Sequence, residues 1–146
     1  MQRLITLTAG LALGLVSLTA CGSDSKSGAG GTDAFCAKIK AYAAATDITA
    51  PSGADSLKTT YTSLQAMVHD MQKSAPAEVK KDIDLMATST DSIVAIFEKY
   101  NWDETALNAS SEVADLFATL NSPETEAAQQ RLNDYSAKTC GVTIGS

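Results

Sequence analysis

The sequence predicts an all-α protein, a bundle of four to five helices. From residue 33 onward, apolar residues recur at steps of three and four, the spacing of one helix face, with little sign of strand alternation. The prolines, Pro51, Pro76 and Pro123, fall between these apolar stripes. Because proline disfavours a helix interior, each one indicates a boundary between neighbouring helices.

The first two helices are expected on either side of a loop over residues 47–53. A cap at Thr32 or Asp33 opens the first helix, which carries Phe35, Ile39 and Tyr42 on one face. The second helix ends near Ala75. Its stripe consists of Leu57, Tyr61, Leu64, Val68 and Met71. Each stripe gives its helix one face to bury against the bundle.

The third helix has the most regular pattern in the chain. We expect it to begin with Pro76 at the first helical position, where the missing N–H costs nothing, and to end before Asn101 and Trp102. Its stripe keeps the alternating step of four and three residues throughout: Val79, Ile83, Met86, Thr90, Ile93, Phe97 and Tyr100. This is the strongest helical signal in the chain.

A fourth helix is expected over residues 104–120, weakened in its middle by residues 108–111. Its apolar set is Leu107, Val113, Leu116, Phe117 and Leu120. A fifth helix follows, capped by Ser122 with Pro123 at its first position, and Gly141 suits its C-terminal end. Its apolar face holds Ala128, Leu132, Tyr135 and Thr139.

The N-terminus has the pattern of a secretory signal. Arg3 precedes an uncharged apolar run from Leu4 to Leu18, which ends in small residues. This run is shorter than the roughly 20 residues that a membrane-spanning helix needs, and Cys-Gly-Ser-Asp follows it rather than a basic cluster. We therefore expect residues 1–20 to be a signal peptide.

Leu18-Thr19-Ala20-Cys21 resembles the lipobox of bacterial lipoproteins. The resemblance implies that the Cys21 thiol receives diacylglycerol and that the chain is cut before it. The alternative is an ordinary secreted protein with a cysteine there by accident. Residues 22–32 are small, polar and glycine-rich, as in a flexible tether. The predicted organisation is a signal peptide (1–20), a lipidated cysteine with its tether (21–32) and a helical domain (33–146).

Three cysteines in an exported chain leave one unpaired thiol. If lipid modifies Cys21, Cys36 and Cys140 remain, and an oxidising exterior favours a disulfide between them. Five helices in strict up-and-down order would hold these residues more than about 20 Å apart, whereas a disulfide needs Cα atoms about 4.4 to 6.8 Å apart. At least one helix must then cross a four-helix core, and the broken fourth helix or the short first helix is the natural candidate.

Composition argues against several classes of function. The net charge of −6 and the lack of a basic stripe argue against nucleic acid as a partner. His69 is the single histidine, and with two isolated cysteines it shows no metal-ligand spacing, so neither a metal nor a cofactor is expected. No Gly-x-Ser-x-Gly elbow accompanies His69. We therefore expect a protein that is not an enzyme.

The lipobox, the glycine-serine tether and a helical domain bounded by Phe35-Cys36 and Cys140-Gly141 resemble the small helical lipoproteins of actinobacteria. The resemblance implies a lipid-anchored protein on the outer face of the cell membrane, without an assigned activity. Within that class we expect a non-enzymatic binding or adaptor module, its partner an envelope protein. Trp102 and Tyr100 are candidate binding residues, although the pattern favours a place in the core for Trp102.

The alternative is a carrier of a small apolar ligand, with Met67, Met71, Met86 and Tyr100 lining its cavity, or packed as ordinary core. An envelope enzyme would need His69 in a cleft with two polar partners. An apolar cavity favours the carrier, whereas a large exposed apolar patch favours a protein partner.

Overall fold

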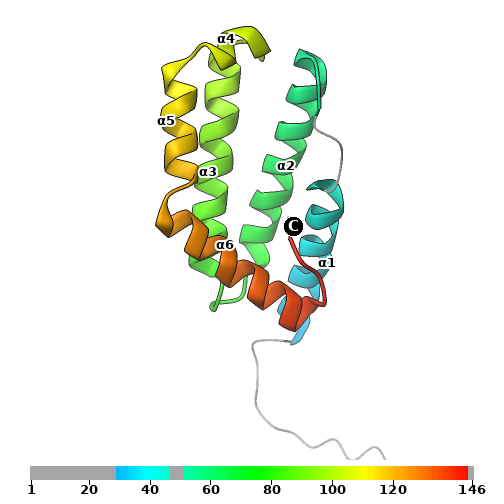
Figure 1. The fold of residues 1–146 in the computed structure, drawn as a ribbon. Coiled ribbons are helices and arrows are strands. Elements are labelled where there is room, and N and C mark those ends of the chain that lie inside the picture. The colour runs from blue at the N-terminus through cyan, green and yellow to red at the C-terminus, as the bar shows by residue number, and fades with distance from the viewer. Residues whose placement is uncertain (1–28, 47–50, 145–146) are drawn as a thin grey trace, which may run out of the picture.

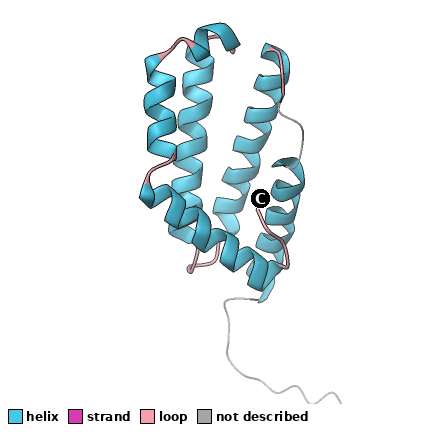
Figure 2. Ribbon diagram, viewed as in Figure 1, coloured by secondary structure: helices cyan, strands magenta, loops and turns pink. Residues whose placement is uncertain are grey.

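The computed structural model describes residues 29–46 and 51–144. The predicted signal peptide, Cys21 and most of the predicted tether lie outside these ranges. Every regular element in the described ranges is a helix (Figure 2), which confirms the all-α fold. The elements are α1 (Ala29–Thr46), α2 (Ala54–Ser74), α3 (Lys80–Lys99), α4 (Glu104–Asn108), α5 (Ser111–Leu120) and α6 (Pro123–Tyr135), followed by a π-helical turn (Ser136–Cys140).

The crossing helix of the bundle is α6. In Figure 1, α1, α2, α3 and α5 run roughly along the bundle, while α6 lies obliquely across its lower end. The prediction of one crossing helix is confirmed, but its assignment to the first or fourth helix was wrong. The physical reason is that the π-helical turn after α6 holds Cys140, which is bonded to Cys36 of α1, so α6 must carry the chain from α5 back to α1.

The disulfide between Cys36 and Cys140 is present as predicted, with its Cα atoms 5.1 Å apart. It joins α1 to the π-helical turn after α6. Gly141 then adopts a left-handed conformation with φ 66°, and the Val142 N–H donates to the Ser136 carbonyl at 3.3 Å. This arrangement ends the helix, as glycine at this position commonly does, and turns the C-terminal segment back from α6.

Two helix starts differ from the predictions. The third helix begins at Lys80 and not at Pro76, because residues 76–79 form a separate turn that reverses the chain after α2. In this turn the Val79 N–H donates to the Pro76 carbonyl at 3.1 Å, and Val79 has a non-helical φ of −119°. The first helix begins at Ala29, inside the predicted tether. Once the following turns are fixed by packing, adding residues to a helix costs little compared with nucleating it.

The other helix ends agree with the sequence patterns. The predicted weakness in the fourth helix is a true break between α4 and α5. Asp103 caps α4 by accepting a hydrogen bond from the Ala106 N–H at 3.0 Å. Ser122 caps α6 by accepting one from the Thr125 N–H at 3.4 Å, with Pro123 in the first turn. These caps satisfy backbone donors that have no partner within the helix.

The core has two parts. The lower part, beside the disulfide, is formed by Phe35, Ile39, Val68, Met71, Val79, Ile83, Ala87, Leu132 and Cys140. The upper part is formed by Leu57, Val94, Phe97, Trp102, Leu107 and Val113. Both draw on α2 and α3, which form the central pair of the bundle. Within the described ranges, no helix is both long enough and apolar enough to cross a bilayer.

Candidate ligand-binding cavity

A cavity of about 330 Å³ lies where α6 crosses α3. Its apolar wall is formed mainly by Leu85, Met86, Ile93, Leu120, Leu132 and Ile144. Polar groups come from α1, α3 and α6, namely Tyr42, Thr46, Asp82, Ser89, Thr90, Thr125, Gln129 and Asn133, and Ala128 completes the lining. The cavity therefore combines a largely aliphatic interior with a small set of hydrogen-bonding groups.

The spacing along α3 and α6 explains why these residues meet. On α3 the lining positions recur at steps of three and four from Asp82 to Ile93, so they occupy one helix face. On α6 the face from Thr125 to Asn133 does the same. Helices that cross obliquely pack closely at one point and diverge away from it. The space left between them is bordered by α1 and Ile144 and is partly open to solvent.

Several polar groups of the lining are already paired within their own helices. The Thr90 hydroxyl donates to the Met86 carbonyl at 2.8 Å, and the Thr46 hydroxyl donates to the Ala43 carbonyl at 3.0 Å. Such bonds to the preceding turn consume the hydroxyl proton. These threonines therefore contribute mainly methyl groups and acceptor oxygens to the cavity.

Asp82 is the one charged residue among the described lining residues, and its charge is paired. Its side chain is only 7% exposed and meets Arg131 of α6, whose Nη2 lies 2.6 Å from Oδ1 and whose Nε lies 3.2 Å from both carboxylate oxygens. These hydrogen bonds raise the pKa of Arg131. A buried carboxylate needs such a partner. The ion pair holds α6 against α3, and the positive charge of Arg131 compensates the negative charge of Asp82 in the cavity wall.

Tyr42 of α1 adds an uncharged phenol to the lining. Burial raises its pKa above the ordinary value, because the phenolate form is poorly solvated there. The ring is half-buried and also packs on the lower core. Tyr42 therefore stays a neutral hydrogen-bonding group at any physiological pH.

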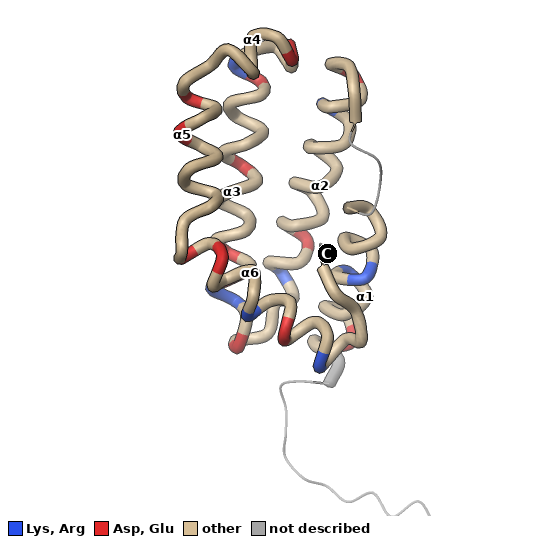
Figure 3. The backbone as a smooth tube through the Cα atoms, in the orientation of Figure 1, with Lys and Arg blue, Asp and Glu red and all other residues tan. Residues whose placement is uncertain are grey.

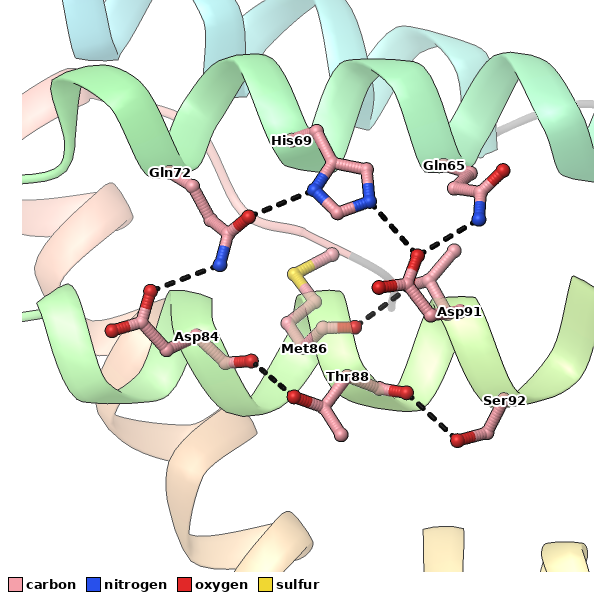
Figure 4. Close-up of polar contacts among 9 residues, drawn as sticks. Gln65, His69, Gln72, Asp84, Met86, Thr88, Asp91 and Ser92 are labelled. Atoms are coloured by element: carbon pink, nitrogen blue, oxygen red, sulfur yellow. Dashed lines mark hydrogen bonds and ion pairs between the residues drawn. The ribbon is translucent and has the colours of Figure 1, made fainter.

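His69 lies outside the cavity, in a polar network between α2 and α3 (Figure 4). Its Nδ1 is 2.8 Å from Gln72 Oε1, and its Nε2 is 2.8 Å from Asp91 Oδ1. The Gln72 amide nitrogen donates to Asp84 at 3.0 Å, which turns its oxygen toward the histidine. Both ring nitrogens thus face acceptors, an arrangement that suits the doubly protonated imidazolium.

These contacts favour the protonated form of His69. Hydrogen bonds to Gln72 and then to Asp91 raise the pKa of His69. The pKa of Asp91 is lowered, first by its hydrogen bond from Gln65. In the protonated form, both N–H groups of His69 are engaged by these two acceptors. The network is a polar contact that joins α2 to α3.

The candidate binding residue Trp102 lies in the upper core, 5% exposed, with its ring edge-to-face against Phe97 at 5.6 Å. Trp102 therefore occupies the core position that the sequence favoured over a binding role. Tyr100 is half-buried, and its hydroxyl accepts a hydrogen bond from Ser110 at 2.8 Å. Neither residue lines the cavity.

Of the predicted cavity residues, Met86 alone lines the cavity, whereas Met71 is fully buried in the lower core and Met67 lies outside the lining. Sequence reasoning missed Asn133 and Ile144. Ala128 and Leu132 were expected to be apolar positions, but their helix had no assigned place in the bundle. The sequence signal that could have indicated Ile144 is an apolar residue shortly after Gly141, the glycine that ends the last helix.

The described surface offers little apolar area. Phe117 on α5, 52% exposed, is the large hydrophobic side chain exposed there. Acidic and basic residues are spread over the helices and do not gather on one face (Figure 3). No group of three or more side chains in the described ranges could hold a metal ion. The described domain thus offers a cavity, rather than a broad apolar patch or a metal site, as a place for a ligand.

Comparisons of the chain with protein-family models, with curated proteins and with solved structures gave no match. The function must therefore be argued from the geometry of the domain itself.

Proposed function

We propose that this protein is a non-enzymatic binding protein, held at the outer face of the cell membrane by lipid on Cys21, and that its helical domain binds a small, largely apolar molecule. The observation that carries the proposal is the cavity of about 330 Å³ between α1, α3 and α6. Within the binding-module class, the geometry favours the carrier of a small molecule over the adaptor for a protein partner.

The dimensions of the cavity support this choice. Small-molecule sites in proteins begin at about 300 Å³. A dry apolar cavity of about 150 Å³ is enough to bind benzene. A ligand about twice that size, with ten to twelve non-hydrogen atoms, therefore suits the cavity described here.

The surface supports the same choice. A protein-docking site normally shows a contiguous apolar patch, whereas Phe117 is an isolated exposed side chain on the described surface. His69 is held by two acceptors and lies outside the cavity, so it offers no acid-base partner to a bound molecule. Binding without chemical change is the role that these contacts favour.

The proposed location at the outer face of the cell membrane rests on the sequence and on the disulfide. The lipobox resemblance places the lipid on Cys21, which lies outside the described residues. The Cys36–Cys140 crosslink suits an oxidising compartment outside the cytoplasm. The short polar segment between Cys21 and α1, residues 22–28, would hold the domain near molecules at the membrane surface.

Naphthalene, an uncharged two-ring molecule, tests the proposal. The chain from residue 22 onward contains every described helix and both parts of the core, so it is a suitable protein. We expect the fluorescence lifetime of naphthalene to rise on binding, and Ser89→Leu to reduce binding by filling the cavity. Thr88→Leu is the matched control, since Thr88 is the exposed neighbour outside the lining. Equal binding by both variants, or none by the unaltered chain, would contradict the proposal.

A further inference from the structure

The orientation of one amide indicates what kind of ligand the cavity takes. Asn133 on α6 lines the cavity, and its Oδ1 accepts a hydrogen bond from the Ile144 backbone N–H at 3.1 Å. A backbone N–H can only donate, so this contact identifies which end of the amide is oxygen. The Nδ2 end, with two donor hydrogens, has no hydrogen-bond partner among the described residues.

The same contact builds part of the cavity wall. After the left-handed Gly141, the chain turns back, and the bond to Asn133 fixes Ile144 where its side chain borders the cavity. Asn133 thus holds the wall with its oxygen and keeps its nitrogen as a donor. No buried side-chain polar atom among the described residues lacks a hydrogen-bond partner, so this nitrogen is open to solvent. An acceptor on a bound molecule can therefore take the place of water at Nδ2.

The charges around the cavity argue against an ionic ligand. The Asp82 carboxylate is already satisfied by Arg131 through both oxygens. An anionic head group would meet no free cation among the lining residues, and it would share the wall with a carboxylate. A cationic head group would have to displace Arg131. Either ion would lose hydration without an equivalent partner.

We propose that the cavity binds an uncharged amphiphile, with an apolar body of about ten carbons and a hydroxyl or carbonyl oxygen that accepts a hydrogen bond from Asn133 Nδ2. The aliphatic residues Leu85, Met86 and Ile93 contact the body of the ligand, and the neutral phenol of Tyr42 adds a second polar group to the lining. This inference rests on the proposed function and specifies its ligand class.

Three ligands with the same ten-carbon chain and different head groups test which head group the cavity prefers. Decanol, decanoate and decylammonium are titrated calorimetrically, below the concentrations at which they aggregate, into the chain from residue 22 onward. We expect decanol to bind about ten-fold more tightly than either ion, or better, because its hydroxyl costs least to desolvate. Decanoate or decylammonium binding as tightly as decanol would overturn the inference, while naphthalene binding would leave the proposed function standing.

The variant Asn133→Asp tests the residue. Aspartate keeps an oxygen to accept from the Ile144 N–H, but it replaces the free donor with a negative charge. We expect decanol to bind about 2- to 12-fold more weakly, the equivalent of one neutral hydrogen bond, and decylammonium to bind more tightly than it does to the unaltered chain. A merely structural role for Asn133 would weaken both ligands together.

Asn108→Asp is the matched control, because it introduces the same charge at an exposed position on α4 outside the cavity. We expect it to leave decanol binding unchanged. Unchanged decanol binding in Asn133→Asp would overturn the assignment of the donor. If Asn133→Asp fails to fold, the three-ligand comparison on the unaltered chain decides the ligand class. Failure of both naphthalene and decanol to bind that chain would contradict the proposed function as well.

Discussion

Reducing the Cys36–Cys140 disulfide should destabilise the domain by several kcal/mol. The two cysteines are 104 residues apart, so their crosslink closes a loop around almost the whole described domain. Chain-entropy reasoning gives about 4.7 kcal/mol for a loop of about 100 residues, and native disulfides typically contribute about 2 to 5 kcal/mol. Reduction changes no side chain except the two sulfurs, so it isolates the effect of the crosslink on the free energy of unfolding.

Urea unfolding followed through Trp102 is the assay. This tryptophan is the single one in the chain and is buried in the upper core, so its emission reports global unfolding. For a slope of about 2 kcal/mol per molar urea, a loss of about 4 kcal/mol lowers the midpoint by about 2 M. Reduction should also weaken naphthalene binding, since Ile144 follows the crosslinked Cys140 by only four residues.

A control chain with Cys36→Ala and Cys140→Ala should unfold at the same urea concentration with and without reductant. The loop argument would be refuted if reduction of the unaltered chain lowered the midpoint by less than about 0.3 M, an amount that corresponds to about 0.6 kcal/mol at the same slope.

Two further predictions concern His69 and Cys21. Because the pKa of His69 is raised in the folded state, its contribution to stability is complete below the unfolded pKa of about 6.5 and is lost as pH rises through the folded pKa. The side chains of His69 and Asp91 are 42% and 45% exposed, so the loss should not exceed about 1 kcal/mol. Urea unfolding at about pH 5.5 and about pH 8.5 should show this loss for the unaltered chain and not for His69→Gln; an equal pH dependence of the two would contradict it. Cys21→Ser should abolish labelling by a fatty-acid analogue and remove the protein from the membrane fraction or leave it as a precursor, and persistent labelling of this variant would disprove the anchor.

The helices were predictable because their signals are local. Apolar residues three and four apart on α2 and α3 define buried faces without knowledge of the rest of the chain. The caps at Asp103 and Ser122 depend on residues within one turn. The misplaced start of α3 has a local cause too, since a separate turn from Pro76 to Val79 precedes the helix.

The cavity was not predictable because it depends on contacts between distant parts of the chain. Asp82 and Arg131 are 49 residues apart, and their pairing fixes where α6 crosses α3. The hydrogen bond from Ile144 to Asn133 forms only after the chain reverses at Gly141. The sequence placed Trp102 at a helix junction, but only packing decides that a residue with φ 60° turns its ring into the core.

Methionine methyl resonances give the most direct test of where a ligand binds. Met86 lines the cavity, whereas Met67, on the neighbouring helix α2, does not. With methyl-labelled methionine, titration of decanol should shift the Met86 methyl signal progressively and leave that of Met67 nearly unchanged. Ser89→Leu, which fills the cavity, should suppress the Met86 shift. A shift at Met67 with Met86 unaffected, or no shift at either residue at saturating decanol, would contradict the cavity as the binding site.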